Sequence, residues 1–434
     1  MMRALVFRTL RPVSQVAAAG VIFAGTALLT GFAALLDTGL STGPEGDTLR
    51  LLPMILGSWT VAIVAFAIVS TVALVINQRE REYALMRAAG ATPGQVRRLV
   101  FGQTLVVALP SIALGVLPGL GIGAIALARL ADAGLAPVSD LRLSAITFTA
   151  GVAASLLAVV IGALFVARGT AKISPVRALA SAREFTTRAV KTRRRSAAIL
   201  FGIGLASGLT VFAMPDATGQ VATAGPACVF SSIGLALLGP SLAASCGRRI
   251  APLLGTVGRL AGHNLGTTGA AAVPALVILV GMATGTLYMQ STDNATQQGS
   301  STDAATIASA NYLVVAMVIA FCAIAVVNTL IAATRDRRRE FGLLRVVAAT
   351  PRQVLGMVSA EALLTALLGI VLGTLASLVT IVPYSLVKLH TPTPAGSPWT
   401  YAGITGGAIV LAFAATLPGT ANSVRAQPIA ALAG

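Results

Sequence analysis

Charged residues, lysine and cysteine are all scarce in this sequence of 434 residues. Only 10% of the residues are charged, against roughly a quarter in soluble domains, while 56% are apolar and the mean hydropathy is +0.86. This composition argues against a water-soluble globular enzyme. The three cysteines, Cys228, Cys246 and Cys322, lie in or beside apolar stretches and form no disulfide or metal pattern.

Residue patterns for catalysis are also lacking. The lysines are Lys172, Lys191 and Lys388, and no stretch reads Gly-x-x-x-x-Gly-Lys-Ser/Thr, so we do not expect this chain to hydrolyse ATP. His263 and His390 stand singly, without spaced carboxylate or cysteine partners, and predict no metal site. The fourteen acidic residues lie almost all in predicted loops and indicate neither a catalytic triad nor paired carboxylates.

Long apolar runs are abundant instead. They run for about twenty residues or more without alternation, which favours membrane-spanning helices over a β-barrel. The sequence therefore predicts an all-α integral membrane protein. We expect ten spans, at residues 13–36, 52–76, 99–129, 144–167, 197–214, 221–244, 270–288, 312–333, 354–387 and 399–420.

The basic residues follow the topology of these spans. With a cytoplasmic N-terminus, 27 of the 31 Lys and Arg residues fall on the inner side, and the outer side keeps Arg50, Arg129, Arg142 and Lys388. This asymmetry is the positive-inside rule. It predicts a multi-pass membrane protein with both termini in the cytoplasm. The net charge of +17 then reflects topology and membrane lipid, and no nucleic-acid partner is expected.

The N-terminal segment precedes a 24-residue apolar run, which is too long for the apolar region of a cleaved signal peptide. We interpret this run as a retained signal anchor. Residues 1–11 place Met2, Leu5, Val6 and Leu10 on one helical face, as an amphipathic helix on the inner membrane surface would. A short frayed terminus explains them equally well.

An internal repeat organises the chain. At an offset of 258 residues, Arg79–Val96 aligns with Arg337–Val354 without a gap, and ten of the eighteen positions are identical. A second similarity relates residues 175–179 to residues 428–432. Six predicted spans separate the matched loops, so both loops face the same side and the repeat is parallel. We therefore divide the chain into an N-terminal amphipathic segment with the first span (1–51), a first module (52–180), a linker with spans five to seven (181–309) and a second module (310–434).

Each matched loop predicts a helix, a turn and a new helix. Thr92, Pro93 and Gln95 supply an N-cap, a first helical residue and a capping-box partner for the following helix, and Thr350, Pro351 and Gln353 repeat them. Before each turn an apolar stripe lies beside an arginine: it comprises Leu85, Met86 and Ala89 beside Arg87, and Leu343, Leu344 and Val347 beside Arg345. Such a stripe outside the membrane needs a protein partner or the membrane surface to cover it.

Two further features lie within the spans. Small residues recur every four positions at Gly115, Gly119 and Gly123, and again at Gly369 and Gly373, which predicts close helix packing. Glu361 falls about two turns into the ninth span, and Gln103 takes its place in the first module. An ionisable group at that depth is a functional candidate. It is also explained by a carboxylate at headgroup depth near a helix N-terminus, which is the interpretation we favour.

These residues resemble the FtsX-like permease family, the membrane subunits of ABC exporters that include the MacB and BceB groups. The resemblance rests on REYALMRAAGATPGQV at 81–96 and REFGLLRVVAATPRQV at 339–354. It implies that both loops are coupling helices seated on a separate ABC ATPase, which holds the ATP and Mg²⁺ while this chain binds no cofactor. The residues it implies for coupling are Arg79, Glu82, Leu85, Met86, Arg87, Thr92, Pro93 and Gln95, with Arg337, Glu340, Leu343, Leu344, Arg345, Thr350, Pro351 and Gln353.

One departure from the family pattern concerns the outer side. MacB-like and BceB-like members carry a large extracytoplasmic domain, whereas residues 289–311 predict a polar loop that is too short for an independent core. We therefore expect a permease subunit that uses two ATPase copies to export or extract an amphiphilic substrate. The alternative is a non-transporting scaffold or signal transducer that relays the state of the ATPase to an extracytoplasmic partner. An ion-coupled carrier is disfavoured by the scarcity of charge within the spans.

Overall fold

The computed structural model describes residues 12–43, 47–77, 80–132, 134, 136, 140–170, 182–253, 255–267, 272–297, 301–346 and 349–425. Within these residues the chain is helical and contains no strand. In this described part of the chain ten helices are long and apolar enough to cross a membrane, and each overlaps one of the ten spans expected from the sequence. The prediction of an all-α multi-pass membrane protein is confirmed.

The chain forms two compact units. Unit 1 comprises residues 1–189 and 297–321, and unit 2 comprises residues 190–296 and 322–434. This grouping differs from the four segments drawn from the repeat, because the first span packs with the first module and most of the predicted linker packs with the second. Residues 1–11, with the predicted amphipathic segment, and the similar stretches 175–179 and 428–432 lie outside the described residues.

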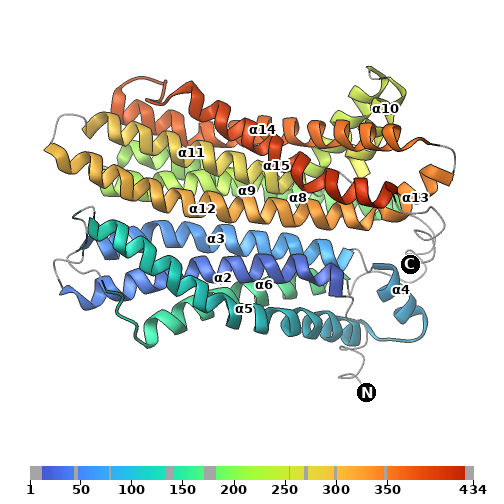
Figure 1. The fold of residues 1–434 in the computed structure, drawn as a ribbon, viewed down its shortest axis with the longest axis horizontal. Coiled ribbons are helices and arrows are strands. Elements are labelled where there is room, and N and C mark those ends of the chain that lie inside the picture. The colour runs from blue at the N-terminus through green and yellow to red at the C-terminus, as the bar shows by residue number, and fades with distance from the viewer. Residues whose placement is uncertain are drawn as a thin grey trace. The chain divides into compact units, whose positions relative to one another are not determined.

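Unit 1 is built around its first helix, whose side chains are mostly buried. This helix, α2, contacts the three other long helices of the unit, which run alongside it in blue to green in Figure 1. At the predicted outer end, Leu35, Leu49, Ala126, Leu127 and Leu130 form an apolar core. The helices of this unit are α2 (Pro12–Ser41), α3 (Asp47–Asn77), α4 (Glu80–Ala88), α5 (Pro93–Asp132) and α6 (Ala145–Thr170).

Unit 2 is built around α11, which is the most buried of the ten candidate spans. Gly281 of α11 lies against Ser232 of α9, and Val280 of α11 lies against Gly373 of α14. The helices of this unit are α8 (Ala182–Thr210, which starts in unit 1), η2 (Val211–Ala213), α9 (Ala217–Ile250), η3 (Ala251–Leu253), α10 (Thr256–Thr267), α11 (Val273–Gln297), α12 (Ser301–Asp336, whose first part is in unit 1), α13 (Arg338–Val346), α14 (Pro351–Leu389) and α15 (Pro398–Arg425).

The polar stretch 289–311 differs from its expected form as a loop. Helix α11 continues to Gln297 and α12 begins at Ser301, so the described part of this stretch is helical. The loop was expected because hydropathy falls at residue 289, which marks where a helix leaves lipid. A helix can keep its backbone hydrogen bonds beyond that point, and α11 does so past the end of its apolar run.

The glycines expected to serve helix packing lie against neighbouring backbones. A Cβ atom added to Gly115 or Gly119 would stand 2.7 Å or 2.6 Å from a carbonyl oxygen of α2, and one added to Gly123 would stand 3.2 Å from the Gly31 oxygen. In unit 2, added Cβ atoms at Gly369 and Gly373 would lie 2.6 Å and 2.7 Å from the Cβ atoms of Leu276 and Val280 on α11. A side chain at Gly115, Gly119, Gly369 or Gly373 would force the neighbouring helix to shift, whereas one at Gly123 would require only a small adjustment of its neighbours.

Candidate functional site

The turn after each short helix is closed by the same pair of hydrogen bonds. In the first module the Thr92 backbone N–H donates to Gln95 Oε1 at 2.9 Å, and the Gln95 N–H donates to Thr92 Oγ1 at 3.3 Å. The corresponding bonds between Thr350 and Gln353 have the same lengths. Both turns therefore contain the expected capping box, with Pro93 or Pro351 as the first residue of the next helix.

The C-termini of the short helices also match. The Ala91 N–H donates to the Met86 oxygen at 3.0 Å, and the Ala349 N–H donates to the Leu344 oxygen at the same distance. In the first module Gly90 has a φ of 99°, the left-handed conformation that closes a Schellman motif at low steric cost. The sequence repeat is therefore also a repeat of backbone hydrogen bonds, which fixes the direction of each short helix.

Each short helix presents one leucine to its surroundings. Leu85 on α4 is 56% exposed and Leu343 on α13 is 54% exposed, while Met86 and Leu344 beside them are partly exposed. Arg87 and Arg345 are also partly exposed. Leu85 and Leu343 are therefore available to an outside partner, while Leu344 also packs against the apolar cluster around Phe341. Val347, the last residue of the second stripe, lies outside the described residues. Arg79 lies outside the described residues.

An aromatic side chain anchors each short helix from its other side. Tyr83 is 3% exposed, and its hydroxyl donates to Gln103 Oε1 on α5 at 3.0 Å. Phe341, 258 residues later, is 1% exposed and packs with Ala261 of α10 and with Val354 and Met357 of α14. Each short helix is thus held by a buried aromatic residue and exposes a leucine two residues later. A force applied by a partner at the leucine could therefore reach the next span through the aromatic residue.

Glu361 is buried and paired, at the base of α13. Arg337, the residue between α12 and α13, places Nη1 2.7 Å from both carboxylate oxygens of Glu361. Its Nε atom donates to Glu340 at 3.0 Å, and its guanidinium carbon lies 5.3 Å from the centre of the Phe341 ring. Burial acts to lower the pKa of Arg337, but the charges and hydrogen bonds of Glu361 and Glu340 raise it above its ordinary value, so Arg337 stays protonated.

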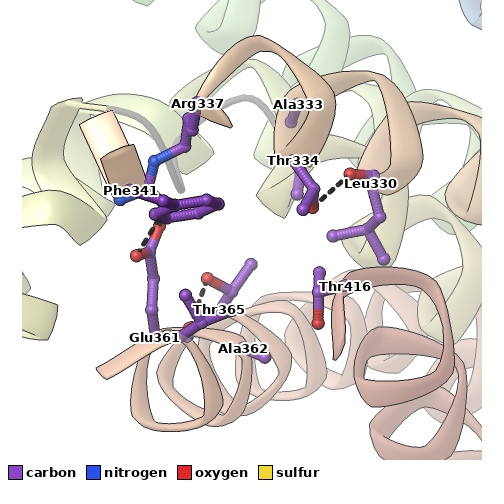
Figure 2. A pocket seen from close by; sticks show the side chains of 11 residues that line it. Leu330, Ala333, Thr334, Arg337, Phe341, Glu361, Ala362, Thr365 and Thr416 are labelled. Carbon is purple, nitrogen blue, oxygen red and sulfur yellow. Dashed lines mark hydrogen bonds and ion pairs between the residues drawn. The ribbon is translucent and has the colours of Figure 1, made fainter. Parts of the chain in front are cut away.

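A small cavity of about 40 Å³ borders this ion pair. Figure 2 shows the side chains of Arg337 and Glu361 meeting at one side of it, with Phe341 beside them. The other lining residues are Ala272, Leu330, Ala333, Thr334, Val358, Ala362, Thr365 and Thr416. The hydroxyls of Thr334, Thr365 and Thr416 donate to carbonyls of their own helices, so most of the surface that faces the cavity is apolar.

A second buried polar cluster was not predicted from the sequence. The Tyr384 hydroxyl of α14 donates to Asp293 Oδ1 of α11 at 2.5 Å, and Lys388 Nζ lies 3.5 Å from the same oxygen. Asp293 lies five residues beyond the predicted end of the seventh span, in the stretch expected to be a loop. The spacing of Tyr384 and Lys388, four residues apart on one helix face, is the signal that could have pointed to a shared partner.

Unit 1 has a comparable polar contact at its predicted outer end. Asp37 of α2 accepts hydrogen bonds from the Ser144 backbone N–H at 2.7 Å, from Ser144 Oγ at 2.8 Å and from Thr147 Oγ1 at 2.6 Å. It thereby binds the N-terminus of α6, where helix N–H groups lack intrahelical partners. This contact fastens α6 to α2 and supplies no chemistry beyond that.

Fold and site together define a class: an all-helical, multi-pass membrane subunit with a repeated helix, turn and helix after one of its spans. The family model for the FtsX-like permease C-terminal domain matches residues 54–175 and 312–428, which together make up more than half of the chain. The chain belongs to the FtsX-like permease family. Members of this family are generally membrane subunits of ABC transporters that work with separate ABC ATPase subunits. No curated protein matches the chain significantly.

Proposed function

We propose that this chain is the permease subunit of an ABC exporter and that α4 and α13 each seat on one ATPase subunit. ATP and Mg²⁺ bind to the ATPase, and this chain converts closure of two ATPase copies into movement of its spans. The substrate is an amphiphile exported or extracted from the bacterial cytoplasmic membrane, in which both termini face the cytoplasm. The order of ten spans resembles the BceB group, without a large extracytoplasmic domain.

One observation carries this proposal. Two short helices, equivalent under the 258-residue repeat, share a buried aromatic, an exposed leucine and a capped turn into the next span. Positive-inside topology alone requires only basic residues in these loops. It does not require an apolar side chain that stays more than half exposed at the same position of both copies. A partner surface that covers Leu85 and Leu343 explains the repetition.

The test is loss of ATPase binding when these leucines become charged. Leu85→Asp and Leu343→Asp should each weaken co-purification of the partner ABC ATPase, and the double variant should abolish it. An ionised carboxylate in an apolar contact costs more than the roughly 1 to 3 kcal/mol of an unpaired neutral polar group. Membrane insertion should be unchanged, since both side chains are exposed in the free chain.

Thr393→Asp is the matched control. It adds the same charge at an exposed position in the loop between α14 and α15, at the predicted outer end, and should leave ATPase recovery at the wild-type level. Equal recovery of the ATPase with both single variants and the double variant would refute the docking assignment. If the wild-type chain recovered both the ATPase and an extracytoplasmic protein but moved no amphiphile in an ATP-dependent way in reconstituted vesicles, the signalling alternative would be favoured.

A further inference from the structure

Three elements at one end of unit 2 carry a group of exposed arginines. These elements are the start of α8, the end of α9 and the short helix α10, and in Figure 1 α10 lies toward the same end of the unit as α13. All six arginine side chains are exposed. We call them the basic cluster, which comprises Arg193, Arg194, Arg195, Arg248, Arg249 and Arg259.

No acidic side chain neutralises the basic cluster. Between residues 190 and 272 the one acidic residue is Asp216, which lies at the predicted outer end. Among the residues that the structure describes, no ion pair joins an arginine of the cluster to a carboxylate. Arg248 Nε donates to the Ala244 carbonyl of its own helix at 3.2 Å, which leaves its charge uncompensated. The cluster therefore presents positive charge alone.

The two predicted docking loops differ from the basic cluster in this respect. Residues 78–98 contain two glutamates among their arginines, and residues 335–354 contain Asp336 and Glu340. The positive-inside rule requires an excess of basic residues and does not require acids to be absent. The segment from α8 to α10 also lies between the two stretches matched by the family model. Its pure positive charge is therefore a feature of its own, beyond topology and beyond the repeat.

Helices α9 and α10 form a tight hairpin that holds half of the cluster together. Gly247 of α9 lies against the Gly262 oxygen of α10, a contact that leaves no room for a side chain. Arg248 and Arg249 directly follow Gly247, and Arg259 precedes Gly262 by three residues. Helix geometry therefore places these three arginines within about one turn of each other along the hairpin.

The arginines lie at the depth of lipid headgroups. The sixth span is predicted to end at residue 244, and Arg248 and Arg249 follow it by four and five residues, which is about 6 to 8 Å along a helix. Arg195 precedes the predicted start of the fifth span by two residues. The headgroup layer adds about 5 to 8 Å on each side of the hydrocarbon core. The guanidinium groups are therefore within reach of lipid phosphates.

Helix α10 has one buried side and one side that suits a membrane surface. Ala261 and Leu265 are buried, and Ala261 packs with Phe341. Arg259 is exposed, and the adjacent Leu260 side chain is 49% exposed. An exposed leucine beside an arginine at this depth is typical of a helix at the membrane interface. An acidic protein surface would match the arginine alone, whereas a lipid matches both side chains.

We propose that the basic cluster binds the headgroup phosphates of anionic phospholipids in the cytoplasmic leaflet. The guanidinium group suits this role because its planar N–H groups donate paired hydrogen bonds to phosphate oxygens. Because Ala261 of α10 packs with Phe341, bound lipid also steadies the element that lies behind α13. The binding depends on the predicted orientation in the membrane and does not require the ATPase.

Native mass spectrometry of the full chain in detergent tests the lipid preference. The chain is mixed with phosphatidylglycerol and phosphatidylcholine that have the same acyl chains, and the ratio of the two bound lipids is measured. The wild-type chain should bind phosphatidylglycerol preferentially. In the triple variant Arg248→Gln, Arg249→Gln, Arg259→Gln the ratio should fall about fivefold or more, because one arginine at an anionic membrane surface contributes about that factor. Equal binding of both lipids to the wild-type chain would overturn the inference.

The matched control removes three other exposed arginines of the predicted inner side. It combines Arg97→Gln, Arg98→Gln and Arg352→Gln, which lie in the predicted docking loops outside the basic cluster. The net charge falls as much as in the first triple variant, but the cluster is intact, so the lipid ratio should stay at the wild-type value. An equal fall in both triple variants would assign the preference to net charge and overturn the inference.

A second measurement leaves all six arginines in place. A fluorophore is attached at Leu260→Cys in a Cys246→Ser background, because the other two native cysteines are buried. The reference position is Gly94→Cys, where an added Cβ atom meets nothing within 4 Å. In nanodiscs, phosphatidylglycerol with a spin label near its headgroup should quench the fluorophore at 260 more strongly than equally labelled phosphatidylcholine. This ratio should be lower at 94, and equal ratios at the two positions would contradict the proposed site.

Recovery of the ATPase separates this inference from its rival and from the proposed function. If the wild-type chain shows no lipid preference and the first triple variant loses the ATPase, the arginines bind an acidic face of the ATPase and the inference fails. If the wild-type chain itself recovers no ATPase, the proposed function fails instead, and the lipid measurements still decide on the basic cluster.

Discussion

Tyr83 and Phe341 occupy equivalent positions of the two modules and are both buried, yet they hold their helices by different means. Tyr83 donates a hydrogen bond to Gln103 at 3.0 Å, whereas Phe341 packs in an apolar cluster and lies 5.3 Å from the guanidinium of Arg337. One hydroxyl group is the whole difference between the two side chains. The residue facing the aromatic also differs: the first module has Gln103 where the second has Glu361. The aromatic residue and its polar neighbour on the next helix therefore differ together between the two modules.

This difference predicts unequal effects of truncation on stability. Tyr83→Phe removes one hydrogen bond between neutral groups and should cost about 0.5 to 1.5 kcal/mol. Glu361→Ala leaves Arg337 buried without its main partner and should cost about 3 to 5 kcal/mol. Unfolding of both variants in detergent, followed by circular dichroism against denaturant, compares the two costs. Equal costs would mean that water reaches Arg337 and replaces the carboxylate.

Helix packing in unit 1 gives a prediction with a control on the same helix. An added Cβ atom at Gly119 would lie 2.6 Å from the Ala27 oxygen, so Gly119→Ala must separate α5 from α2. Overpacking of this kind typically costs about 1 to 3 kcal/mol. An added Cβ atom at Gly121 meets nothing within 4 Å, and Gly121→Ala should be neutral or stabilising. Thermal unfolding should rank Gly119→Ala below wild type, and the reverse ranking would contradict the packing.

The capped turns give a prediction that is the same for both modules. Thr92→Ala and Thr350→Ala each remove an N-cap side chain that accepts a bond at 3.3 Å, and each should cost about 0.5 to 2 kcal/mol. Thr→Ser at either position retains the hydroxyl and should restore most of the loss. Hydrogen exchange of the first turn of α5 and α14 measures the local effect. Exchange that is unchanged by both alanine variants would show that the caps do not hold these turns.

Orientation in the membrane is tested by cysteine labelling in a Cys246→Ser background. Cysteines at Leu85 and Leu343 should resist a membrane-impermeant thiol reagent in intact cells and react after permeabilisation, because both lie in loops that the positive-inside rule assigns to the cytoplasm. A cysteine at Thr393 should react without permeabilisation. Labelling of Leu343→Cys from outside would show that the second module has the opposite orientation in the membrane. The two short helices would then lie on opposite sides and could not both dock on a cytoplasmic ATPase.

Much of the fold could be predicted because lipid imposes a simple rule on the sequence. A span must be apolar for about twenty residues, and hydropathy therefore located all ten candidate spans and most of their ends within a few residues. The turns at Thr92 and Thr350 were also readable, since a capping box is a local pattern of three residues. Hydropathy did not predict that α11 continues to Gln297, because helical hydrogen bonds persist beyond the apolar run.

The paired side chains of unit 2 could not be read in the same way. Arg337 and Glu361 are 24 residues apart, and Asp293 and Tyr384 are 91 apart, so each contact depends on how two helices pack. Sequence reasoning placed Glu361 at headgroup depth near a helix start. The structure shows in addition that Glu361 is buried against Arg337, a contact that this reasoning did not predict. The resemblance between the modules indicated where coupling residues lie, without indicating which of them contact one another.

The central claim is that one chain offers two docking helices to a two-subunit ATPase motor. Native mass spectrometry of the detergent-purified complex measures this directly. The account predicts one copy of this chain with two copies of the ATPase, and one copy with one ATPase when either Leu85→Asp or Leu343→Asp is present. An assembly of two chains with two ATPase copies would contradict it, because each chain would then supply a single docking helix and the internal repeat would not replace dimerisation.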